Sequence, residues 1–495
     1  MTSIARAKKA ASFEVRNPGN GEVVGTYPIQ SAADVGAAVA RARLAATWWA
    51  GLGFEERARR VDAFRGVLAR RHAQLAAVMN EETGKPHSDG SMEVAVVLDH
   101  LAWGAKNAGK VLGRRKVASG LASIHLAGTV EYRPLGVVGV IGPWNFPVMT
   151  PLGSIAFALL AGNAVVFKPS EFSPGVGAWL VDAFGQVVPE YPVLQLITGD
   201  GSTGAALCRA DVDKIAFTGS TATAKKVMAV CAERLTPMVA ECGGKDAMLV
   251  DRDADVDRAV DGAAWAGFTN AGQACIGTER VYVHEDVYDE FLAKLAVKVD
   301  GLRAGTDAAA KIGPIVMPSQ VGVIEGHIAD ALSRGASIAA GGGPTQGQIV
   351  QPVVLVDVPE DALANCEETF GPTLTVRKVA SMAEAVDLTN ASRYGLGATV
   401  FAKKDGIKLA SRIRSGMVSV NSVFSKAVLP TVPFGGVGDS GFGRIHGPDG
   451  LREFSYAHSV VRQRFAPLLP LTTFERGPKQ DALLAKIVGL LHGGK

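Results

Sequence analysis

The stretch "GVVGVIGPWNFP", residues 136–147, decides the fold of this chain. Its first six residues form a short apolar run typical of a buried strand, and the Gly and Pro residues that follow mark a loop. Three similar runs come later, each with a helical stretch behind it: "NAVVFKPS" (163–170), "PVLQLITG" (192–199) and "KIAFTGS" (214–220). This alternation predicts a parallel sheet with helices on both faces, which binds ligands outside the carboxyl ends of its strands.

A second alternating series runs from about residue 246 to about residue 437. It includes "AMLV" (247–250), "GASIAAGG" (335–342) and "SGMVSVNS" (415–422). The sequence therefore predicts an α/β protein with two Rossmann-like parallel-sheet domains. A chain of 495 residues has room for two or three domains, so this division fits its length.

The segments before and between these series have simpler patterns. Helices are expected over residues 31–50 and 54–82, and Gly84-Lys85-Pro86 ends the second one. The stretch 121–133 is typical of a β-hairpin with its turn near Gly128.

Composition and charge exclude several classes of protein. The net charge of +3 is small for the length and predicts neither a nucleic-acid partner nor an acidic membrane. Five irregularly spaced cysteines without a CxxC pair predict no disulfide framework, and no cluster with metal-ligand spacing is present. A reducing cytoplasm is the expected compartment. The basic N-terminal stretch lacks an apolar core, so it is not a secretory signal, and no apolar run is long enough to span a membrane.

Two of the predicted strand ends carry polar residues with a functional and a structural interpretation. In "PWNFP" (143–147), Asn145 is either a satisfied turn residue or an amide donor aimed at a developing oxyanion. In "KPSE" (168–171), Lys168 and Glu171 are either a surface ion pair or part of a binding edge.

Two further strand ends have the same ambiguity. "FTGST" (217–221) closes a strand and opens a helix, where free N–H groups and the helix dipole suit a phosphate, although such turns are common. In "ECGGKD" (241–246), Glu241 is either a general base or a turn carboxylate, and the two glycines allow close backbone approach.

The stretch "NAGQACIGTER" (270–280) contains one cysteine between small residues. A lone cysteine is more often a small core residue than a nucleophile. Ala274 and Gly277 leave access to Cys275, however, and a catalytic thiol needs such access.

Taken together, these motifs resemble the NAD(P)-dependent aldehyde dehydrogenase superfamily. The motifs "PWNFP", "KPSE", "FTGS", "ECGGK", "GQAC", "EETFGP" (367–372) and "PFGGVGDSGFGR" (433–444) occur in the family's order, and the resemblance covers residues 12–460. It implies that Cys275 is the catalytic nucleophile, Glu241 the general base and Asn145 the oxyanion donor.

The resemblance also implies a set of coenzyme-binding residues and no metal site. Lys168 and Glu171 match residues at the adenosine ribose, Gly219 and Ser220 lie in the pyrophosphate turn, and Glu368 matches a ligand of the nicotinamide ribose. The full set is Ile141, Pro143, Trp144, Lys168, Ser170, Glu171, Gly201, Phe217, Gly219, Ser220, Cys242, Gly243, Glu368 and Phe370. NAD is the expected coenzyme and NADP the alternative, because a carboxylate at Glu171 accepts ribose hydroxyls but repels a 2′-phosphate.

The domain organisation follows from the same resemblance. It implies a coenzyme-binding domain (1–119 and 134–243), a small β oligomerisation hairpin (120–133), a catalytic domain (244–440) and a C-terminal oligomerisation segment with a tail helix (441–495). A homodimer or homotetramer is expected.

The implied reaction is oxidation of a small-molecule aldehyde to a carboxylic acid, through a thiohemiacetal and a thioester on Cys275. Two rival hypotheses are transfer of the thioester to coenzyme A and a binding protein that has lost activity. Relatives of the first kind lack the general-base Glu, and a protein of the second kind should have lost a catalytic residue. The presence of Glu241, Cys275 and Asn145 argues against both.

The sequence departs from the family pattern at two positions. Cys242 stands where the family usually has Leu, and Ala224 replaces a Gly after the "GST" turn. Ala224 is expected to adopt an ordinary helical conformation, because a required φ > 0 would impair coenzyme binding.

The substrate class is suggested by residues close to the motifs. Candidates for the funnel that leads to Cys275 are Met149, Trp265, Ile276, Val423 and Phe424, and they favour an aliphatic or aromatic aldehyde. A dicarboxylic semialdehyde would need a cation, and Lys426 keeps that alternative open.

The tail contains "DALLAKIVGLLHG" (481–493), which predicts an amphipathic helix. One face gathers apolar residues, namely Leu483, Leu484, Ile487, Val488 and Leu491. We expect a neighbouring subunit or the catalytic domain to cover this face. A membrane surface is the alternative, and the polar face has few Lys and Arg for it.

Overall fold

The computed structural model describes residues 11–120, 123–307, 309–467 and 469–493. The chain forms two compact units. The first comprises Met1–Val111 and Pro134–Ser455, and the second comprises Leu112–Arg133 and Tyr456–Lys495. The first unit holds the two large sheets that the sequence predicts.

The first sheet has six strands in the order β17-β9-β8-β5-β6-β7, and only the β17–β9 pair is antiparallel. Its strands are β5 Val137–Ile141, β6 Ala164–Lys168, β7 Leu194–Leu196, β8 Lys214–Gly219, β9 Met238–Cys242 and β17 Gly441–Phe442. The chain builds the sheet outward from β5 to β7 and then crosses to β8 on the other side of β5. The crevice at such a reversal of strand order is where doubly wound sheets bind their ligands.

Helices surround this sheet. They are α1 Ala32–Gly51, α2 Gly53–Arg70, α3 His72–Thr83, α4 His87–Leu112, α5 Met149–Ala161, α6 Pro174–Val187, α7 Gly201–Arg209 and α8 Thr221–Ala232. The single helix predicted over 54–82 is wrong, because Arg71 leaves the helical region (φ −113°, ψ 17°) between α2 and α3. No Gly or Pro marks this break in the sequence. The helix ends at Gly84, as predicted, and Gly84 adopts the left-handed conformation.

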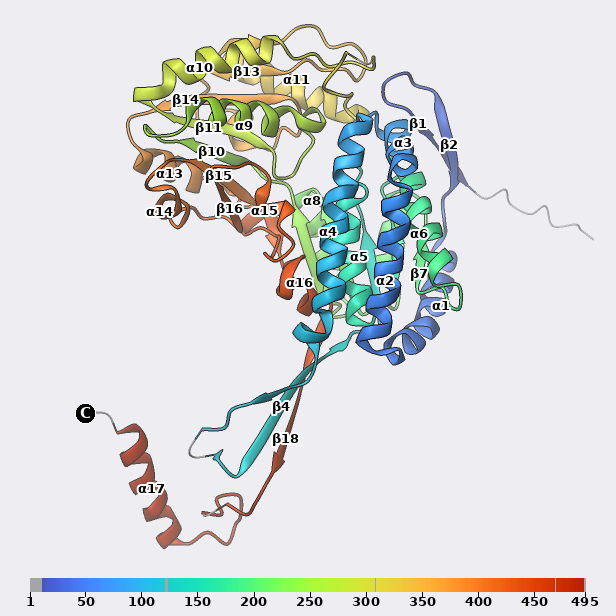
Figure 1. The fold of residues 1–495 in the computed structure, drawn as a ribbon, viewed down its shortest axis with the longest axis vertical. Helices are drawn as coiled ribbons and strands as arrows, with labels where there is room; N and C mark the ends of the chain where they lie inside the picture. The colour runs from blue at the N-terminus through green and yellow to red at the C-terminus, as the bar shows by residue number, and fades with distance from the viewer. Residues whose placement is uncertain (1–10, 121–122, 308, 468, 494–495) are drawn as a thin grey trace, which may run out of the picture. The chain divides into compact units, whose positions relative to one another are not determined.

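The second sheet has seven strands in the order β12-β13-β14-β11-β10-β15-β16, parallel except for β12. Its strands are β10 Asp246–Val250, β11 Thr278–His284, β12 Ser337–Gly341, β13 Val353–Val356, β14 Thr373–Val379, β15 Gly397–Phe401 and β16 Met417–Val420. Side chains alternate between its faces. Met248 and Val250 join the core under α9 (Val256–Phe268), α10 (Glu285–Asp300) and α11 (Pro318–Ser333). Ala247 and Leu249 join the core under α13 (Met382–Asn390) and α14 (Gly406–Ala410) (Figure 1).

The remaining elements of the first unit are the helices that pack on the second sheet, three short helices and a small β-ribbon. The helices on the second sheet are α9 Val256–Phe268, α10 Glu285–Asp300, α11 Pro318–Ser333, α13 Met382–Asn390 and α14 Gly406–Ala410. Short helices are α12 Leu363–Cys366, α15 Ser425–Val428 and α16 Gly447–Glu453. Strands β1 Ser12–Arg16 and β2 Val23–Pro28 form an antiparallel ribbon.

The second unit contains a three-stranded sheet and the tail helix. The sheet has the order β18-β4-β3, with β3 Arg115–Val117, β4 Leu126–Pro134 and β18 Ser455–Gln463. The hairpin predicted with a turn near Gly128 is wrong, because Gly128 lies inside β4 and pairs with Val117. A Cβ on Gly128 would lie 2.6 Å from the Val117 side chain, so this glycine makes room for a neighbour instead of turning the chain. Residues 121–122 of the predicted hairpin lie outside the described residues.

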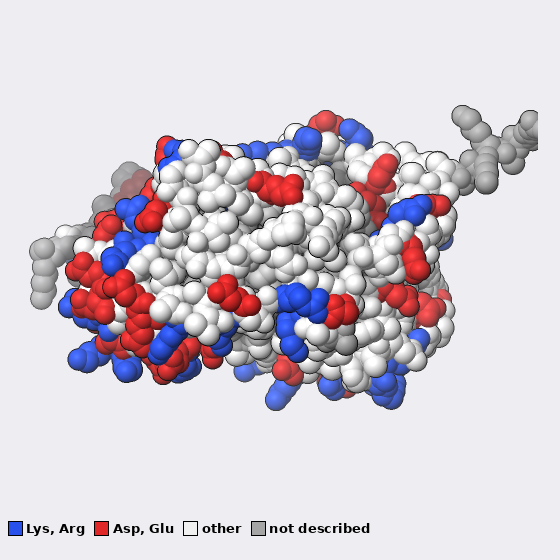
Figure 2. Space-filling view, turned by 90° about the horizontal axis from the view of Figure 1, so that it is seen from above, with Lys and Arg blue, Asp and Glu red and all other residues white. Residues whose placement is uncertain are grey.

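The tail helix is present as α17 Pro478–His492. Within the described ranges, no helix is long and apolar enough to cross a membrane, and no group of three potential ligands is placed to hold a metal ion. On the face of the molecule drawn in Figure 2, basic and acidic side chains are intermixed around an uncharged centre.

Candidate active site

Cys275 lies on a strained loop between the 3₁₀ turn Thr269–Gly272 and β11. Asn270, Ala271 and Gly272 have φ values of 51°, 56° and 70°, so three successive residues are left-handed. This conformation is strained for non-glycine residues, so the surrounding structure must stabilise it. A Cβ on Gly272 would lie 2.0 Å from the carbonyl oxygen of Gly371, so the loop is packed directly against the "EETFGP" segment.

Two buried amides hold this loop in place. The Gln273 side chain donates to the carbonyl oxygens of Asn270 (2.8 Å) and Pro314 (3.2 Å) and accepts from the Val316 N–H (2.8 Å). The Asn270 amide donates to the carbonyl oxygens of Gln273 (3.1 Å) and Asn145 (3.0 Å). Neither amide was predicted to have a role, although both residues belong to the stretch "NAGQACIGTER" (270–280).

Asn145 lies beside the same loop. Its buried amide donates to the carbonyl oxygen of Gln273 at 3.0 Å, which uses one of the two N–H groups of that amide. Lys85 donates to the Asn145 carbonyl oxygen at 2.8 Å and forms a fully buried ion pair with Glu93. The structure therefore brings Asn145 and the cysteine loop together, and Lys85 helps to fix the position of Asn145.

Glu241 is a buried carboxylate at the end of β9. Neither carboxylate oxygen makes a hydrogen bond of ordinary geometry within the described part of the chain. Burial raises the pKa of Glu241 to about 7, and the charge of Asp246 adds to this, while the Cys275 thiol and the Thr218 hydroxyl lie close enough to oppose it. Thr218 faces Glu241 across the β8–β9 pair. A carboxyl with a pKa near 7 is suited to general-base catalysis at neutral pH.

The Cys275 thiol shares this environment. Burial raises its pKa well above the usual range, and the carboxylates of Glu241, Glu368 and Asp246 raise it further. Its side chain is nonetheless partly open, in contrast to its neighbours Ala274 and Ile276. The Cys275 thiol and the Glu241 carboxyl are therefore neighbours in one acidic environment.

The two glycines of "ECGGK" allow neighbouring groups to come close to the backbone, as the sequence suggested. A Cβ on Gly243 would lie 2.0 Å from the Glu368 carboxylate, and one on Gly244 would lie 2.5 Å from the Cys275 carbonyl oxygen. The Gly244 N–H donates to Glu368 at 2.9 Å. Side chains at these two positions would push Glu368 and the cysteine loop away from Glu241.

The "KPSE" residues form a half-buried pair at the end of β6. The ammonium of Lys168 lies 3.8 Å from the carboxylate of Glu171, and their side chains are 5% and 41% exposed. Burial lowers the pKa of Lys168, although the charge of Glu171 opposes this effect. Ser170 donates to Glu171 at 3.4 Å. Lys168 and Glu171 are therefore not a surface ion pair between two exposed groups, because the Lys168 side chain is almost fully buried.

The remaining coenzyme candidates lie at the same edge of the first sheet. Ser220 caps α8, and its hydroxyl accepts the Thr223 N–H at 3.3 Å. Ile141, Phe217 and Gly219 lie in the last positions of β5 and β8, Pro143 follows β5, and Gly201 begins α7. Trp144 and Phe370 meet edge to face with ring centroids 5.5 Å apart. Ala224 lies within α8 and has no positive φ, as expected for the departure from Gly.

Cys242 is a buried neutral thiol. Burial and the nearby Glu241 raise its pKa to about 12, which keeps it protonated at neutral pH. Its sulfur would lie 3.4 Å from a Cβ on Gly441, so it packs against β17. These properties are those of a small apolar residue, like the Leu it replaces.

The substrate-funnel candidates include one aromatic pair. Trp265 and Phe424 meet edge to face with centroids 4.9 Å apart, and Trp265 is 40% exposed. Lys426 is buried, and its ammonium lies 3.2 Å from the Asp246 carboxylate and donates to the Ala398 carbonyl oxygen at 3.3 Å. Its charge is therefore already paired inside the protein.

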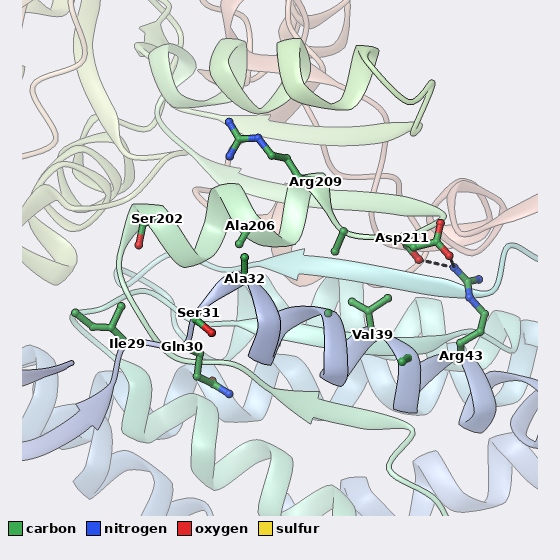
Figure 3. Close-up of a pocket in the computed structure, with 13 residues that line it drawn as sticks. Ile29, Gln30, Ser31, Ala32, Val39, Arg43, Ser202, Ala206, Arg209 and Asp211 are labelled. Atoms are coloured by element: carbon green, nitrogen blue, oxygen red, sulfur yellow. Dashed lines mark hydrogen bonds and ion pairs between the residues drawn. The ribbon is translucent and has the colours of Figure 1, made fainter. Parts of the chain in front are cut away.

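A surface groove of about 830 Å³ lies elsewhere, between α1 and α7 (Figure 3). Its walls carry Arg43 and Asp211, which pair with each other, and no thiol or predicted site residue lines it. The groove is larger than many ligand sites, but it lacks the chemical groups that surround Cys275.

Together, the doubly wound sheet and the thiol beside a carboxylate are typical of a dehydrogenase that works through a cysteine. A model of the aldehyde dehydrogenase family matches residues 4–460, and the chain belongs to this family.

Individual relatives agree with this assignment. A 4,4'-diapolycopene aldehyde oxidase of Methylomonas sp is 38% identical over 453 residues, which cover 90% of this chain and 85% of that protein. A protein of Mycolicibacterium smegmatis, provisionally named as an NADP(+)-dependent succinate-semialdehyde dehydrogenase, is 36% identical over 458 residues (91% and 88% of the two chains). The crystal structure of betaine aldehyde dehydrogenase from Staphylococcus aureus in complex with NAD+ has a TM-score of 0.87 and 29% identity, over 93% of this chain and 94% of that chain.

The raised pKa of Glu241 generates a prediction about pH. A base must be deprotonated to act, so steady-state turnover should rise with pH through about 7, the pKa of Glu241. In Glu241→Gln this limb should disappear, and turnover at neutral pH should fall by roughly 10²–10⁴. Rates measured between pH 5.5 and 8.5 on both proteins check this, with circular dichroism to confirm folding. A Gln variant that keeps the same rising limb would show that another group titrates.

Proposed function

We propose that this protein oxidises an apolar aldehyde to the carboxylic acid, with Cys275 as nucleophile, Glu241 as general base and NAD(P) as hydride acceptor. One observation carries the proposal: the open Cys275 thiol adjoins a buried carboxyl whose pKa is about 7 and whose oxygens lack ordinary hydrogen bonds among the described residues. Family membership supports the same chemistry.

The residues of this pocket divide the reaction between them. Cys275 passes its proton to Glu241, which releases it to solvent, and the Cys275 sulfur then attacks the aldehyde carbon and forms a tetrahedral oxyanion. The free N–H of the Asn145 amide and the Cys275 backbone N–H stabilise this oxyanion, and one such donor contributes about 3–4 kcal/mol. Loss of hydride from that carbon gives a thioester on Cys275. Glu241 then takes a proton from water, the resulting hydroxide attacks the thioester carbon, and the acid leaves as Glu241 returns that proton to the Cys275 sulfur.

The residues at the edge of the first sheet fit a dinucleotide. Ser220 and the N-terminus of α8 offer N–H groups to a phosphate, Glu171 offers a half-exposed carboxylate to a ribose, and Gly243 keeps the backbone close to Glu368. When bound, the oxidised coenzyme supplies the hydride acceptor. We also propose that the first sheet belongs to the coenzyme-binding domain and the second to the catalytic domain.

The paired state of Lys426 supports an apolar substrate. A dicarboxylic semialdehyde needs a free cation near the funnel, but Asp246 already neutralises Lys426 at 3.2 Å in a buried pair. Trp265 and Phe424 offer aromatic surface instead. The relatives divide on this point, since one is named for a long apolar aldehyde and the other for succinate semialdehyde.

Assembly and compartment complete the proposal. The second unit exposes Tyr456, Val460 and Val461 along β18. Such an apolar strand favours a contact with another copy, so we propose a homodimer or homotetramer. Five free cysteines fit a reducing cytoplasm.

Replacement of the nucleophile tests the mechanism. Cys275→Ala should abolish NADH formation while the coenzyme still quenches tryptophan fluorescence on binding. Cys242→Leu is the matched control, because it removes a neighbouring buried thiol and should keep turnover within about threefold, as expected for a near-isosteric core change. Substantial NADH production by Cys275→Ala would refute the mechanism, and an inactive Cys242→Leu would assign that thiol a chemical role.

A panel of aldehydes tests the substrate class. Hexanal and benzaldehyde should be used at least roughly tenfold more efficiently in kcat/KM than succinic semialdehyde, because the second carboxylate finds no unpaired cation. Steady-state absorbance at 340 nm gives these values. A clear preference for the semialdehyde would mean that the substrate displaces Asp246 from Lys426 and would overturn the apolar assignment.

Glu171 sets the expected coenzyme preference. Hydrogen bonds to a charged carboxylate are strong, and a 2′-phosphate would both remove one donor and repel Glu171. Lys168 offsets part of this, so NAD should be preferred by about ten- to a hundredfold, a difference of roughly 1.4–2.8 kcal/mol. Kinetics with both coenzymes should show this gap in the native protein and a smaller or reversed gap in Glu171→Ser. Equal efficiencies in both proteins would place Glu171 away from the ribose.

A further inference from the structure

The tail of this protein lies beyond the part that defines the family. The family match ends at residue 460, whereas α17 spans Pro478–His492. None of the described side chains of α17 is buried, so its own unit leaves the apolar face of the helix open. Phe474, just before the helix, and Leu490 within it are almost fully exposed.

The apolar residues of α17 form one broad face. At about 100° per residue, six apolar side chains fall within an arc of about 160°. They are Leu483, Leu484, Ile487, Val488, Leu490 and Leu491. The opposite side carries the small residues Ala482, Ala485 and Gly489. A helix with this shape needs an apolar surface to lie on.

The charge of the second unit indicates which kind of surface the apolar face of α17 would bind. Residues 112–133 and 456–495 carry ten Lys and Arg but three Asp and Glu, a net charge of +7 in 62 residues. The whole chain has a net charge of +3, so the other 433 residues sum to −4. The small overall charge therefore conceals a strongly basic unit, which the chain-wide total could not reveal.

Lysines border the apolar arc. Lys479 and Lys486 fall beside Leu490 at one edge of the arc, where long side chains can reach charged headgroups while the helix lies flat. At the other edge, Asp481 pairs with Arg476 at 2.6 Å, so its negative charge is compensated. The polar face of α17 alone has few cations, but the sheet and the chain before the helix add to the field.

We propose that this unit docks the protein on an anionic lipid surface, with α17 lying in the interface plane. A second copy, which the apolar strand β18 favours as a partner, is the less suitable occupant of the α17 face, because the lysines beside this face would meet a unit that carries the same charge of +7. The helix is too short and too polar to span a bilayer, so the attachment is peripheral. The proposal does not depend on the substrate, although an apolar aldehyde dissolved in a membrane would then lie close to its enzyme.

Vesicle sedimentation of the full chain tests this docking. The protein should pellet with vesicles that contain phosphatidylglycerol but not with pure phosphatidylcholine. Binding should weaken between about 0.1 M and about 0.5 M salt, as the Debye length falls from about 10 Å to about 4 Å. Equal binding to both vesicles, or none to either, would overturn the proposal.

Paired variants identify the surface. Leu483→Asp with Leu491→Asp, and separately Lys479→Glu with Lys486→Glu, should each lower vesicle binding by roughly tenfold or more. The matched controls lie in the first unit: Leu235→Asp, at a leucine that is 90% exposed, and Lys403→Glu with Lys404→Glu should bind as the native protein does. All variants should oxidise a soluble aldehyde at the native rate, which separates loss of docking from misfolding and from failure of the proposed reaction.

Light scattering tests the alternative that α17 contacts a second copy of the chain. The mass in solution should be the same for the native protein and for the Leu483/Leu491 variant. If that variant instead dissociates to a smaller species and vesicle binding is unchanged, α17 is a subunit contact and the lipid proposal is wrong.

Discussion

The buried ion pair between Lys245 and Glu279 is the interaction on which the site depends. Lys245 lies between β9 and β10, whereas Glu279 lies on β11, four residues after Cys275. Glu279 also accepts the N–H groups of Thr369 (2.9 Å) and Phe370 (3.0 Å), and so fixes the loop that carries Glu368. Removing one partner of such a pair leaves an uncompensated buried charge, at a cost of about 3–5 kcal/mol. The segment after β9, which carries Glu241, the strand that follows the Cys275 loop and the Glu368 loop are thus held by one ion pair.

Around this pair, close backbone contacts set the remaining distances. Gly244 meets the Cys275 carbonyl group and Gly272 meets that of Gly371, each at a distance that excludes a side chain. The left-handed turn at Asn270 and Ala271 points Cys275 out of the core, and the Gln273 amide network holds this turn. Strain at a reactive residue persists only where the surroundings over-determine it, and here hydrogen bonds and packing act together.

The sequence predicted the strands well, because strands are local signals. Short apolar runs identified β5, β6 and β8, and the structure brings Asn145 close to the Cys275 loop and Glu241 close to Cys275, whereas their chemical roles stay predictions. The Lys245–Glu279 pair was missed, because its partners are 34 positions apart and nothing local marks either residue as buried. Gly128 was misread for a similar reason: a glycine that admits a cross-strand Val looks the same as one that turns the chain.

The uncompensated charges around Cys275 and Glu241 are negative. Glu241, Glu368 and Asp246 all raise the pKa of Cys275, and burial has an even larger effect in the same direction. The nearby cations do not relieve this, because Lys245 is paired with Glu279 and Lys426 with Asp246. The raised pKa therefore keeps the Cys275 thiol protonated at neutral pH. A positive charge brought close to both groups would lower both pKa values. In the protein by itself, burial keeps the Cys275 thiol protonated and moves the pKa of Glu241 to about 7.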